Sequence, residues 1–212
     1  MIRRLLVLGI LTLAVACSRR GGDSRLMNPA ADPRAPDTFR VSFETSKGRF
    51  VVEAVRAWAP VGVDRFHHLV SLGYYDGTKF FRVLPGFVAQ FGMHGDPAVN
   101  AAWRERTLPD DSVRTSNAMG TVTFAMGGPQ SRTTQLFINT RDNARLDAMG
   151  FAPIGRVVDG MHVVTSLYAG YGEGPPNGGG PSQELIGEQG NKYLNRSFPA
   201  LDSIIRARIA RR

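Results

Sequence analysis

The fold is decided by one stretch near the middle of the chain, Phe80-Phe81-Arg82-Val83-Leu84-Pro85-Gly86-Phe87-Val88-Ala89-Gln90. Its two apolar runs flank a Pro-Gly pair, a pattern typical of two short β-strands joined by a tight turn. Two polar side chains interrupt the runs, Arg82 before the turn and Gln90 after it. An arginine inside a core is costly unless it is paired or faces a cleft. Arg82 therefore indicates either a functional cleft or a solvent-exposed strand face, and both interpretations stay open at this point.

A second stretch combines glutamine with phenylalanine in the same way. It is a polar loop running into a strand, Gly127-Gly128-Pro129-Gln130-Ser131-Arg132-Thr133-Thr134-Gln135-Leu136-Phe137-Ile138-Asn139-Thr140. Together the two stretches carry F-x-R-x-x-P-G-F-x-x-Q and, further along, Q-x-F-I-N. This pair resembles the cyclophilin family of peptidyl-prolyl cis-trans isomerases, over about residues 38–168. The resemblance implies a mainly β fold, a closed eight-stranded antiparallel barrel with a helix over each opening.

The rest of the chain agrees with a β-barrel. Alternating apolar and polar residues over 38–45 predict a half-buried strand, and 49–55 returns as the second strand of a hairpin. Pro60 suits the first turn of a helix whose apolar positions recur at helical spacing up to Gly73. Further elements are expected as strands at 120–126, 135–140 and 152–158 and as a short helix at 161–169. Many short strands with only two helices favour a barrel over an α/β sheet.

The N-terminus predicts export. Residues 1–16 combine a short basic start with an apolar run, which is the plan of a signal peptide and too short for a comfortable membrane span. The run ends at Cys17, the only cysteine of the chain. Leu13-Ala14-Val15-Ala16-Cys17 resembles a bacterial lipoprotein signal, in which the cysteine is lipidated after cleavage. An ordinary signal peptide with an incidental cysteine is the alternative. We therefore predict a lipid-anchored protein of the cell envelope, on the periplasmic side.

These patterns divide the chain into five parts. The predicted parts are a signal peptide (1–16), a lipidated cysteine with a flexible tether (17–37), the cyclophilin-like domain (38–168), a Gly/Pro-rich loop (169–182) and a C-terminal extension (183–212). The extension is expected to hold a basic helix, because Leu201, Ile204, Ile205 and Ile209 would share one face. Docking of that helix on the barrel is favoured, and a helix lying on lipid is the alternative. A third interpretation makes this helix the functional element and the barrel its scaffold.

Prolyl isomerisation explains why an arginine would stand in a cleft. Rotation about an X-Pro bond breaks amide resonance, a barrier of about 18–20 kcal/mol. In the twisted transition state the prolyl nitrogen becomes pyramidal and can accept a hydrogen bond that the planar ground state cannot. A donor aimed at that nitrogen binds the transition state better than the substrate, which is the condition for catalysis. Arginine suits this task because it stays charged and its planar fork can be held by a neighbour.

The resemblance implies the roles of the site residues. Arg82 is the donor, Gln90 steadies its guanidinium and binds the substrate backbone, and Gln135 helps to fix the substrate chain. Phe87, Val88, Phe137 and Leu146 form the apolar floor that takes the proline ring, and Met126 and Phe151 complete the substrate-binding set. The chemistry requires no cofactor, metal, nucleophile or proton transfer, and we predict none.

Several positions depart from the family pattern. Val88 stands where the best-known members have Met, and Met126 stands where they have Asn. Phe151 is nearest by count to the family's pocket His. Arg145 stands where animal members carry Trp and many bacterial ones Phe, so we predict weak cyclosporin binding and an altered substrate preference. Residues 98–116 lack the family's glycine-rich loop, and we expect a long loop with a remodelled second subsite.

The predicted function is isomerisation of X-Pro bonds in unfolded or exported polypeptides, assisting their folding. The alternative is a non-catalytic, proline-binding or chaperone-like module of the cell envelope. A composition of 42% hydrophobic and 21% charged residues is ordinary for a soluble globular domain. The formal net charge of +8 includes four arginines at or after position 206. Such a basic tail is more often a solvated helix end than a nucleic-acid site, and we predict no nucleic-acid partner.

Overall fold

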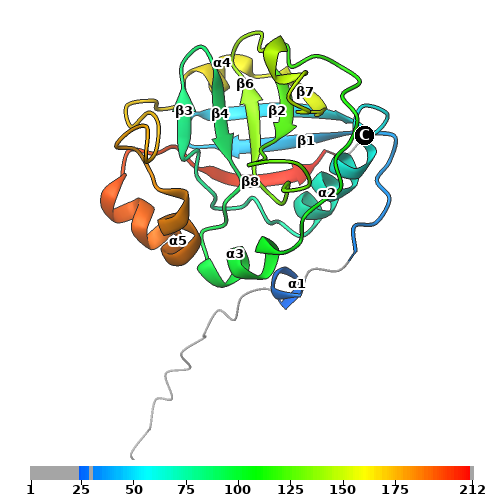
Figure 1. The fold of residues 1–212 in the computed structure, drawn as a ribbon. Coiled ribbons are helices and arrows are strands. Elements are labelled where there is room, and N and C mark those ends of the chain that lie inside the picture. Colours follow the sequence, from blue (N-terminus) through cyan, green and yellow to red (C-terminus); the bar gives the residue numbers. More distant parts are fainter. Residues whose placement is uncertain (1–23, 29–30, 211–212) are drawn as a thin grey trace, which may run out of the picture.

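Eight antiparallel strands form one curled sheet in the computed structural model, which describes residues 24–28 and 31–210 (Figure 1). The strands are β1 (Thr38–Thr45), β2 (Gly48–Val55), β3 (Arg82–Leu84), β4 (Val88–Phe91), β5 (Thr121–Phe124), β6 (Leu136–Asn139), β7 (Pro153–Asp159) and β8 (Ile204–Ile209). The helices are α1 (Ser24–Met27), α2 (Pro60–Ser71), α3 (Pro97–Arg104), α4 (Met161–Thr165) and α5 (Gln183–Ser197), with a 3-10 turn η1 (Ala144–Leu146). The strand order is β3-β4-β6-β5-β7-β2-β1-β8. The predicted eight-stranded, mainly β architecture is confirmed.

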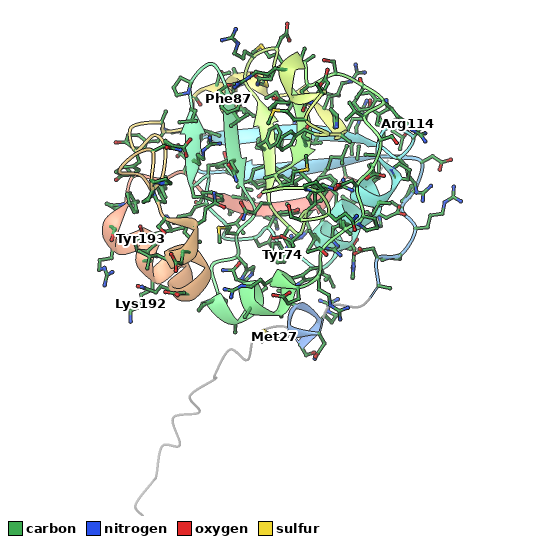
Figure 2. All side chains as sticks on the ribbon, in the orientation of Figure 1. Met27, Tyr74, Phe87, Arg114, Lys192 and Tyr193 are labelled. Carbon is green, nitrogen blue, oxygen red and sulfur yellow. The ribbon has the colours of Figure 1, made fainter. Side chains whose placement is uncertain are left out.

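The concave side of the sheet holds an aromatic core. Phe43 of β1 and Phe50 of β2 are paired in register, and their buried rings stack with centroids 4.8 Å apart. Tyr74 lies in the interior, whereas the side chains of Arg114 and Lys192 project outward (Figure 2). Each fully buried phenylalanine contributes about 1.5–3 kcal/mol relative to an exposed one, so this core fixes the curl of the sheet.

Helix α2 forms as its sequence predicts. Pro60 occupies its first turn, and its buried side chains include Val63, Phe66 and Val70. Its N-terminal N–H groups are capped from a distance, because Val61 and Gly62 donate to the carboxylate of Asp111 at 3.0 and 2.9 Å. Asp111 also pairs with Arg132 at 3.0 Å, and both side chains are almost fully buried. A segment fifty residues away thereby fixes the start of the helix.

The barrel is less closed than expected. The two edge strands, β3 and β8, do not pair with each other along their length. The residues before β3 make a single bridge instead, between Lys79 and Ser203, flanked by backbone hydrogen bonds from Phe80 to Asp202 and from Ile204 to Thr78. The sheet is therefore a curled half-barrel whose edges meet only through this short contact just before β3 and β8.

The predicted basic helix near the C-terminus is wrong. Ile204–Ile209 is strand β8, antiparallel to β1, and the helix of the extension is α5 further upstream. A register shift opposite Glu44 and Thr45 inserts one extra residue, so the buried positions are Ile204 and Ala207. The apolar residues Leu201, Ile204, Ile205 and Ile209 have helical spacing, which explains the error, but Ile205 is 61% exposed and Ile209 is 37% exposed in the strand. The eighth strand of the sheet thus lies outside the range predicted for the domain.

The arginines of β8 have carboxylate partners, one on β1 and one in the turn after α2. Arg206 pairs with Glu44 at 3.0 Å, and Arg208 pairs with Asp76 at 2.7 Å. The alternative of a basic helix lying on lipid, and the scaffold interpretation built on it, lose their structural basis, since these residues belong to the barrel.

The predicted tether is ordered wherever the structure describes it. Leu26 and Ala35 are buried, and the indole N–H of Trp103 donates to the Leu26 carbonyl at 3.0 Å. Asp32 accepts hydrogen bonds from Arg65 at 2.8 Å and lies 2.9 Å from Nδ1 of His68. A few anchors hold this segment although its sequence has no hydrophobic period. The predicted signal peptide and Cys17 lie outside the described residues.

The predicted long loop at 98–116 is partly helical. Helix α3 begins at Pro97, with the carboxylate of Asp96 accepting from the Ala98 N–H at 2.9 Å. Such an Asp-Pro start is a common helix beginning. Across 24–28 and 31–210, no helix has the length and apolar character needed to cross a bilayer.

Candidate active site

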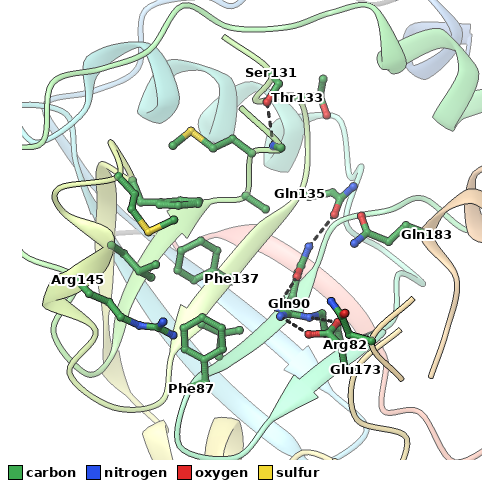
Figure 3. A pocket seen from close by; sticks show the side chains of 18 residues that line it. Arg82, Phe87, Gln90, Ser131, Thr133, Gln135, Phe137, Arg145, Glu173 and Gln183 are labelled. Atoms are coloured by element: carbon green, nitrogen blue, oxygen red, sulfur yellow. Dashed lines mark hydrogen bonds and ion pairs between the residues drawn. The ribbon is translucent and has the colours of Figure 1, made fainter. Parts of the chain in front are cut away.

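One cavity of about 580 Å³ opens beside the β3–β4 hairpin. Its walls come from β4, β6, the loop after β5, the η1 turn and the loop at 170–181 (Figure 3). All nine residues predicted for catalysis and substrate binding line it: Arg82, Phe87, Val88, Gln90, Met126, Gln135, Phe137, Leu146 and Phe151. The structure thus brings together residues from positions 82 to 151, and their individual roles stay predictions.

The hairpin places Arg82 and Gln90 side by side. They are directly paired in the β3–β4 register, and paired residues of antiparallel strands project on the same face. Gly86 has a φ of +68°, which the tight turn requires and which a side chain would disfavour. The Arg82 Nη1 donates to Gln90 Oε1 at 3.1 Å. The sequence spacing of the two polar residues around the Pro-Gly turn therefore produces their contact.

Gln135 continues this row of polar groups. Gln90 Nε2 donates to Gln135 Oε1 at 2.9 Å. Because a guanidinium can only donate, Gln90 must turn its oxygen to Arg82 and its amide nitrogen to Gln135. This chain of hydrogen bonds fixes which way the amide groups of Gln90 and Gln135 face, and it is drawn as dashed lines in Figure 3.

The floor of the cavity is apolar. Val88, Phe137 and Leu146 are buried together there, with the half-buried Phe87 and Phe151 packed against them. Phe137 and Phe151 meet edge to face, with centroids 5.7 Å apart. Such a floor suits a small apolar ring, since it offers aromatic and aliphatic contact without polar groups to desolvate.

Sequence analysis missed Glu173, the cavity residue that forms an ion pair with Arg82. Its carboxylate accepts from Nε and Nη2 of Arg82, both at 2.6 Å (Figure 3). The hydrogen bond from Arg82 is the largest cause that lowers the pKa of Glu173, against the opposing effect of burial. Glu173 lies in the loop predicted only as a Gly/Pro-rich connection. The available signal was weak: Glu173 is the one carboxylate between Asp159 and Glu184, and a sheltered arginine needs a partner.

The family model described as cyclophilin type peptidyl-prolyl cis-trans isomerase matches residues 40–181, about two thirds of the chain. The chain belongs to this family. Peptidyl-prolyl cis-trans isomerase A of Dickeya dadantii is 34% identical over 138 residues, covering 63% of this chain and 73% of the relative. Peptidyl-prolyl cis-trans isomerase B of Escherichia coli is 32% identical over 135 residues, covering 60% and 82%.

Solved structures show the same fold. A Cryptosporidium parvum cyclophilin matches with a TM-score of 0.60 at 19% identity, covering 82% of this chain and 99% of that one. A cyclophilin of Hirschia baltica matches with a TM-score of 0.58 at 20% identity, covering 82% and 75%. The curled sheet is therefore the cyclophilin fold.

This cyclophilin carries a second arginine at the mouth of the cavity. Arg145 of η1 is exposed, and its guanidinium carbon lies 4.8 Å from the centroid of the Phe87 ring. Arg82 lies 5.8 Å from the same ring. Phe87 is thus flanked by two cations, a geometry in which the negative ring face attracts both.

The described part of this cyclophilin contains no cluster of three or more His, Cys, Asp or Glu side chains suited to a metal ion. The polar residues that line the cavity are three glutamines, an asparagine, two arginines of which Arg82 is paired to a glutamate, and the hydroxyl residues Ser131 and Thr133. These groups can donate and accept hydrogen bonds along an extended peptide.

Proposed function

We propose that this cyclophilin accelerates rotation about X-Pro peptide bonds with Arg82 as the donor to the prolyl nitrogen. Isomerase activity follows from its family and from relatives named as peptidyl-prolyl cis-trans isomerases. One observation supports the assignment of the donor: Arg82, Gln90 and Gln135 form a hydrogen-bonded row along the edge of an apolar floor. A proline ring on that floor would bring its nitrogen towards the row.

The chemistry needs only a hydrogen-bond donor that favours the twisted state. The donor must meet the pyramidal nitrogen and must make no equal contact with the planar amide. A desolvated, charged hydrogen bond of about 3–4 kcal/mol would supply roughly 10² to 10³ in rate. The remainder comes from binding the twisted conformer on the floor formed by Val88, Phe137 and Leu146. Gln135 would hold the substrate backbone so that the proline stays in place.

The substrate class is a proline-containing polypeptide. The apolar floor matches a proline ring, and the half-open cavity admits an extended chain. The structural neighbour from Cryptosporidium parvum was also solved in the presence of the dipeptide Ala-Pro. We expect unfolded or exported polypeptides as substrates, because a folded protein rarely presents an extended X-Pro segment.

Comparison of the parent protein with Arg82→Ala tests the donor. Isomerisation of a short X-Pro peptide is measured by NMR exchange, and circular dichroism checks the fold. The expected result is acceleration by the parent and roughly 10²-fold lower kcat/KM in the variant. A well-folded parent that binds the peptide without accelerating its rotation would point instead to the non-catalytic, proline-binding module.

The cell envelope is the proposed site of action. The basic and apolar N-terminal residues and Cys17 support export and a lipid anchor at that cysteine. One acyl group gives marginal membrane binding, so a stable anchor requires more than one chain. Fractionation of cells making the parent or Cys17→Ser tests this: the parent is expected with membranes and the variant in the soluble fraction. An equal distribution of the two would reject the anchor.

A further inference from the structure

The loop at 170–181 is folded around Glu173. The Gly180 N–H donates to the Glu173 carbonyl at 2.8 Å, and the Gly174 N–H donates to the Glu173 carboxylate at 3.0 Å. A Cβ at position 178 would lie 2.2 Å from the Glu173 carbonyl oxygen, closer than any side chain allows. Glycine is therefore required at this position for the loop to close on Glu173. The loop holds one particular side chain at a defined place on the cavity wall.

That side chain meets Arg82 in the geometry of a bidentate ion pair. The two distances of 2.6 Å join Nε to Oε1 and Nη2 to Oε2. Charge-assisted, two-point contacts of this kind fix the plane of the guanidinium as well as its position. The Arg82 side chain is 20% exposed and that of Glu173 is 32% exposed. The pair is thus partly sheltered and is screened less than a pair on the open surface.

Glu173 leaves Arg82 able to donate to a substrate. A guanidinium has five N–H groups, of which Glu173 takes two and Gln90 takes one. Two N–H groups, one each on Nη1 and Nη2, have none of these three contacts. The carboxylate occupies the Nε side of the fork, so it sets which N–H groups face away from the loop.

We propose that Glu173 is a positioning residue, which holds the Arg82 guanidinium in the orientation needed to donate to the prolyl nitrogen. The inference rests on the proposed role of Arg82. An arginine attached through four rotatable bonds loses orientation when it has only one neutral partner, as Gln90 alone would be. A donor fixed before the reaction costs no reorganisation when the peptide twists. The loop at 170–181 is thus part of the catalytic apparatus of this cyclophilin.

Two opposite effects make the inference testable. Glu173 orients the donor, but its negative charge also weakens the positive potential at Arg82. If orientation dominates, removal of the charge slows the reaction. If the weakening of the positive potential at Arg82 dominates, or if the contact with Glu173 keeps Arg82 from the substrate, removal of the negative charge raises the reaction rate. The amide of glutamine keeps the size of the side chain and changes its charge and its hydrogen bonding.

The test compares Glu173→Gln with the parent and with Glu105→Gln, which removes a negative charge from an exposed position after α3. We expect about 10-fold lower kcat/KM for Glu173→Gln, mostly in kcat, because a charge-assisted hydrogen bond is lost. Glu105→Gln should match the parent. Equal or higher activity of Glu173→Gln would overturn the inference, while an inactive parent would reject the proposed function itself.

A double-mutant comparison separates orientation of Arg82 from a general effect on the loop. In an Arg82→Ala background, Glu173→Gln is expected to cause no further loss, because the residue it orients is absent. The same 10-fold loss in that background would mean that Glu173 shapes the loop and does not act through Arg82. The NMR signal of the Arg82 Nε–H provides a second readout: slow exchange in the parent and fast exchange in Glu173→Gln are expected. An Nε–H signal unchanged by the substitution would contradict the contact.

Discussion

The two arginines at the cavity differ in the groups that balance their charge. Arg82 has a carboxylate at 2.6 Å, whereas Arg145 is exposed and contacts the face of the Phe87 ring. A cation over an aromatic ring at an exposed site contributes about 0.5–1 kcal/mol, less than a bidentate ion pair in a sheltered site. The rim at Arg145 is therefore polar and adaptable, while the interior at Arg82 is fixed. Substrate preference should respond to position 145 and catalysis to position 82.

Replacement of Arg145 by tryptophan tests the rim. A large indole beside Phe87 and Leu146 would extend the apolar wall, and we expect affinity for the apolar cyclic peptide cyclosporin to rise by about 3- to 10-fold. Calorimetric titration of the parent and Arg145→Trp measures it. Arg141→Trp, at an exposed position that does not line the cavity, is the matched control and should leave affinity unchanged. Tight binding by the parent would contradict the expectation that Arg145 weakens this ligand.

Several elements depend on contacts from distant parts of the chain. Helix α2 is the clearest case, since Ala59 before it provides no side-chain cap and Asp111 supplies the carboxylate. The same carboxylate balances Arg132, which is only 3% exposed. Loss of one partner of a buried pair leaves an uncompensated charge, so the loop carrying Asp111 stabilises both the helix and the strand entry at Arg132.

Asp111→Ala is therefore expected to lower the free energy of unfolding by about 3–5 kcal/mol. The neighbouring Asp110→Ala is the control, because its contact with Arg132 is longer, 3.4 Å, and its side chain is 33% exposed. We expect Asp110→Ala to lose less than half as much free energy of unfolding as Asp111→Ala. Urea denaturation followed by circular dichroism measures both variants. Equal losses of unfolding free energy in the two variants would show that the cap on α2 and the buried Asp111–Arg132 pair do not stabilise the protein more than the exposed contact does.

The local sequence pattern predicted those helices and strands whose own residues carry the periodicity or the starting signal. Alternation gave β1 and β2, and the proline start gave α2. Strand β8 was mistaken for a helix because its apolar residues have helical spacing, whereas its pairing with β1, with a register shift beside Glu44, exists only in the folded sheet. The Arg82–Gln90 contact was predictable from the hairpin spacing. The Arg82–Glu173 pair was not, since it joins residues 91 positions apart through a loop with no periodicity.

The stability of the whole molecule depends on pH through half-buried histidines and paired carboxylates. Burial lowers the pKa of His67 and His94 below the ordinary value of 6.5. Burial opposes ionisation of Asp64, but hydrogen bonds from Arg56 and from the Ala35 backbone outweigh it and lower the pKa of Asp64 below 3.8. In each case the unfolded chain binds more protons than the folded chain, so stability falls as pH falls.

The pH dependence follows from these directions. The histidine contribution is fully present above pH 6.5 and is lost as pH falls below that value, and the Asp64 contribution is lost below about pH 3.8. We expect Tm to decrease between pH 7 and pH 5, measured by scanning calorimetry. In His94→Asn, whose amide oxygen can still accept the Asp96 N–H, the decrease should be smaller. A Tm that rises on acidification would contradict the assignment.

Strand β8 also has a consequence for synthesis. Its Arg206 pairs with Glu44 of β1 across 162 residues of sequence, so the β1 edge has no partner while the intervening chain is being made. At typical translation rates this interval lasts on the order of ten seconds or more. A nascent chain in this state cannot complete its eight-stranded sheet. The order of the strands therefore means that the complete sheet requires almost all of the domain to have been synthesised.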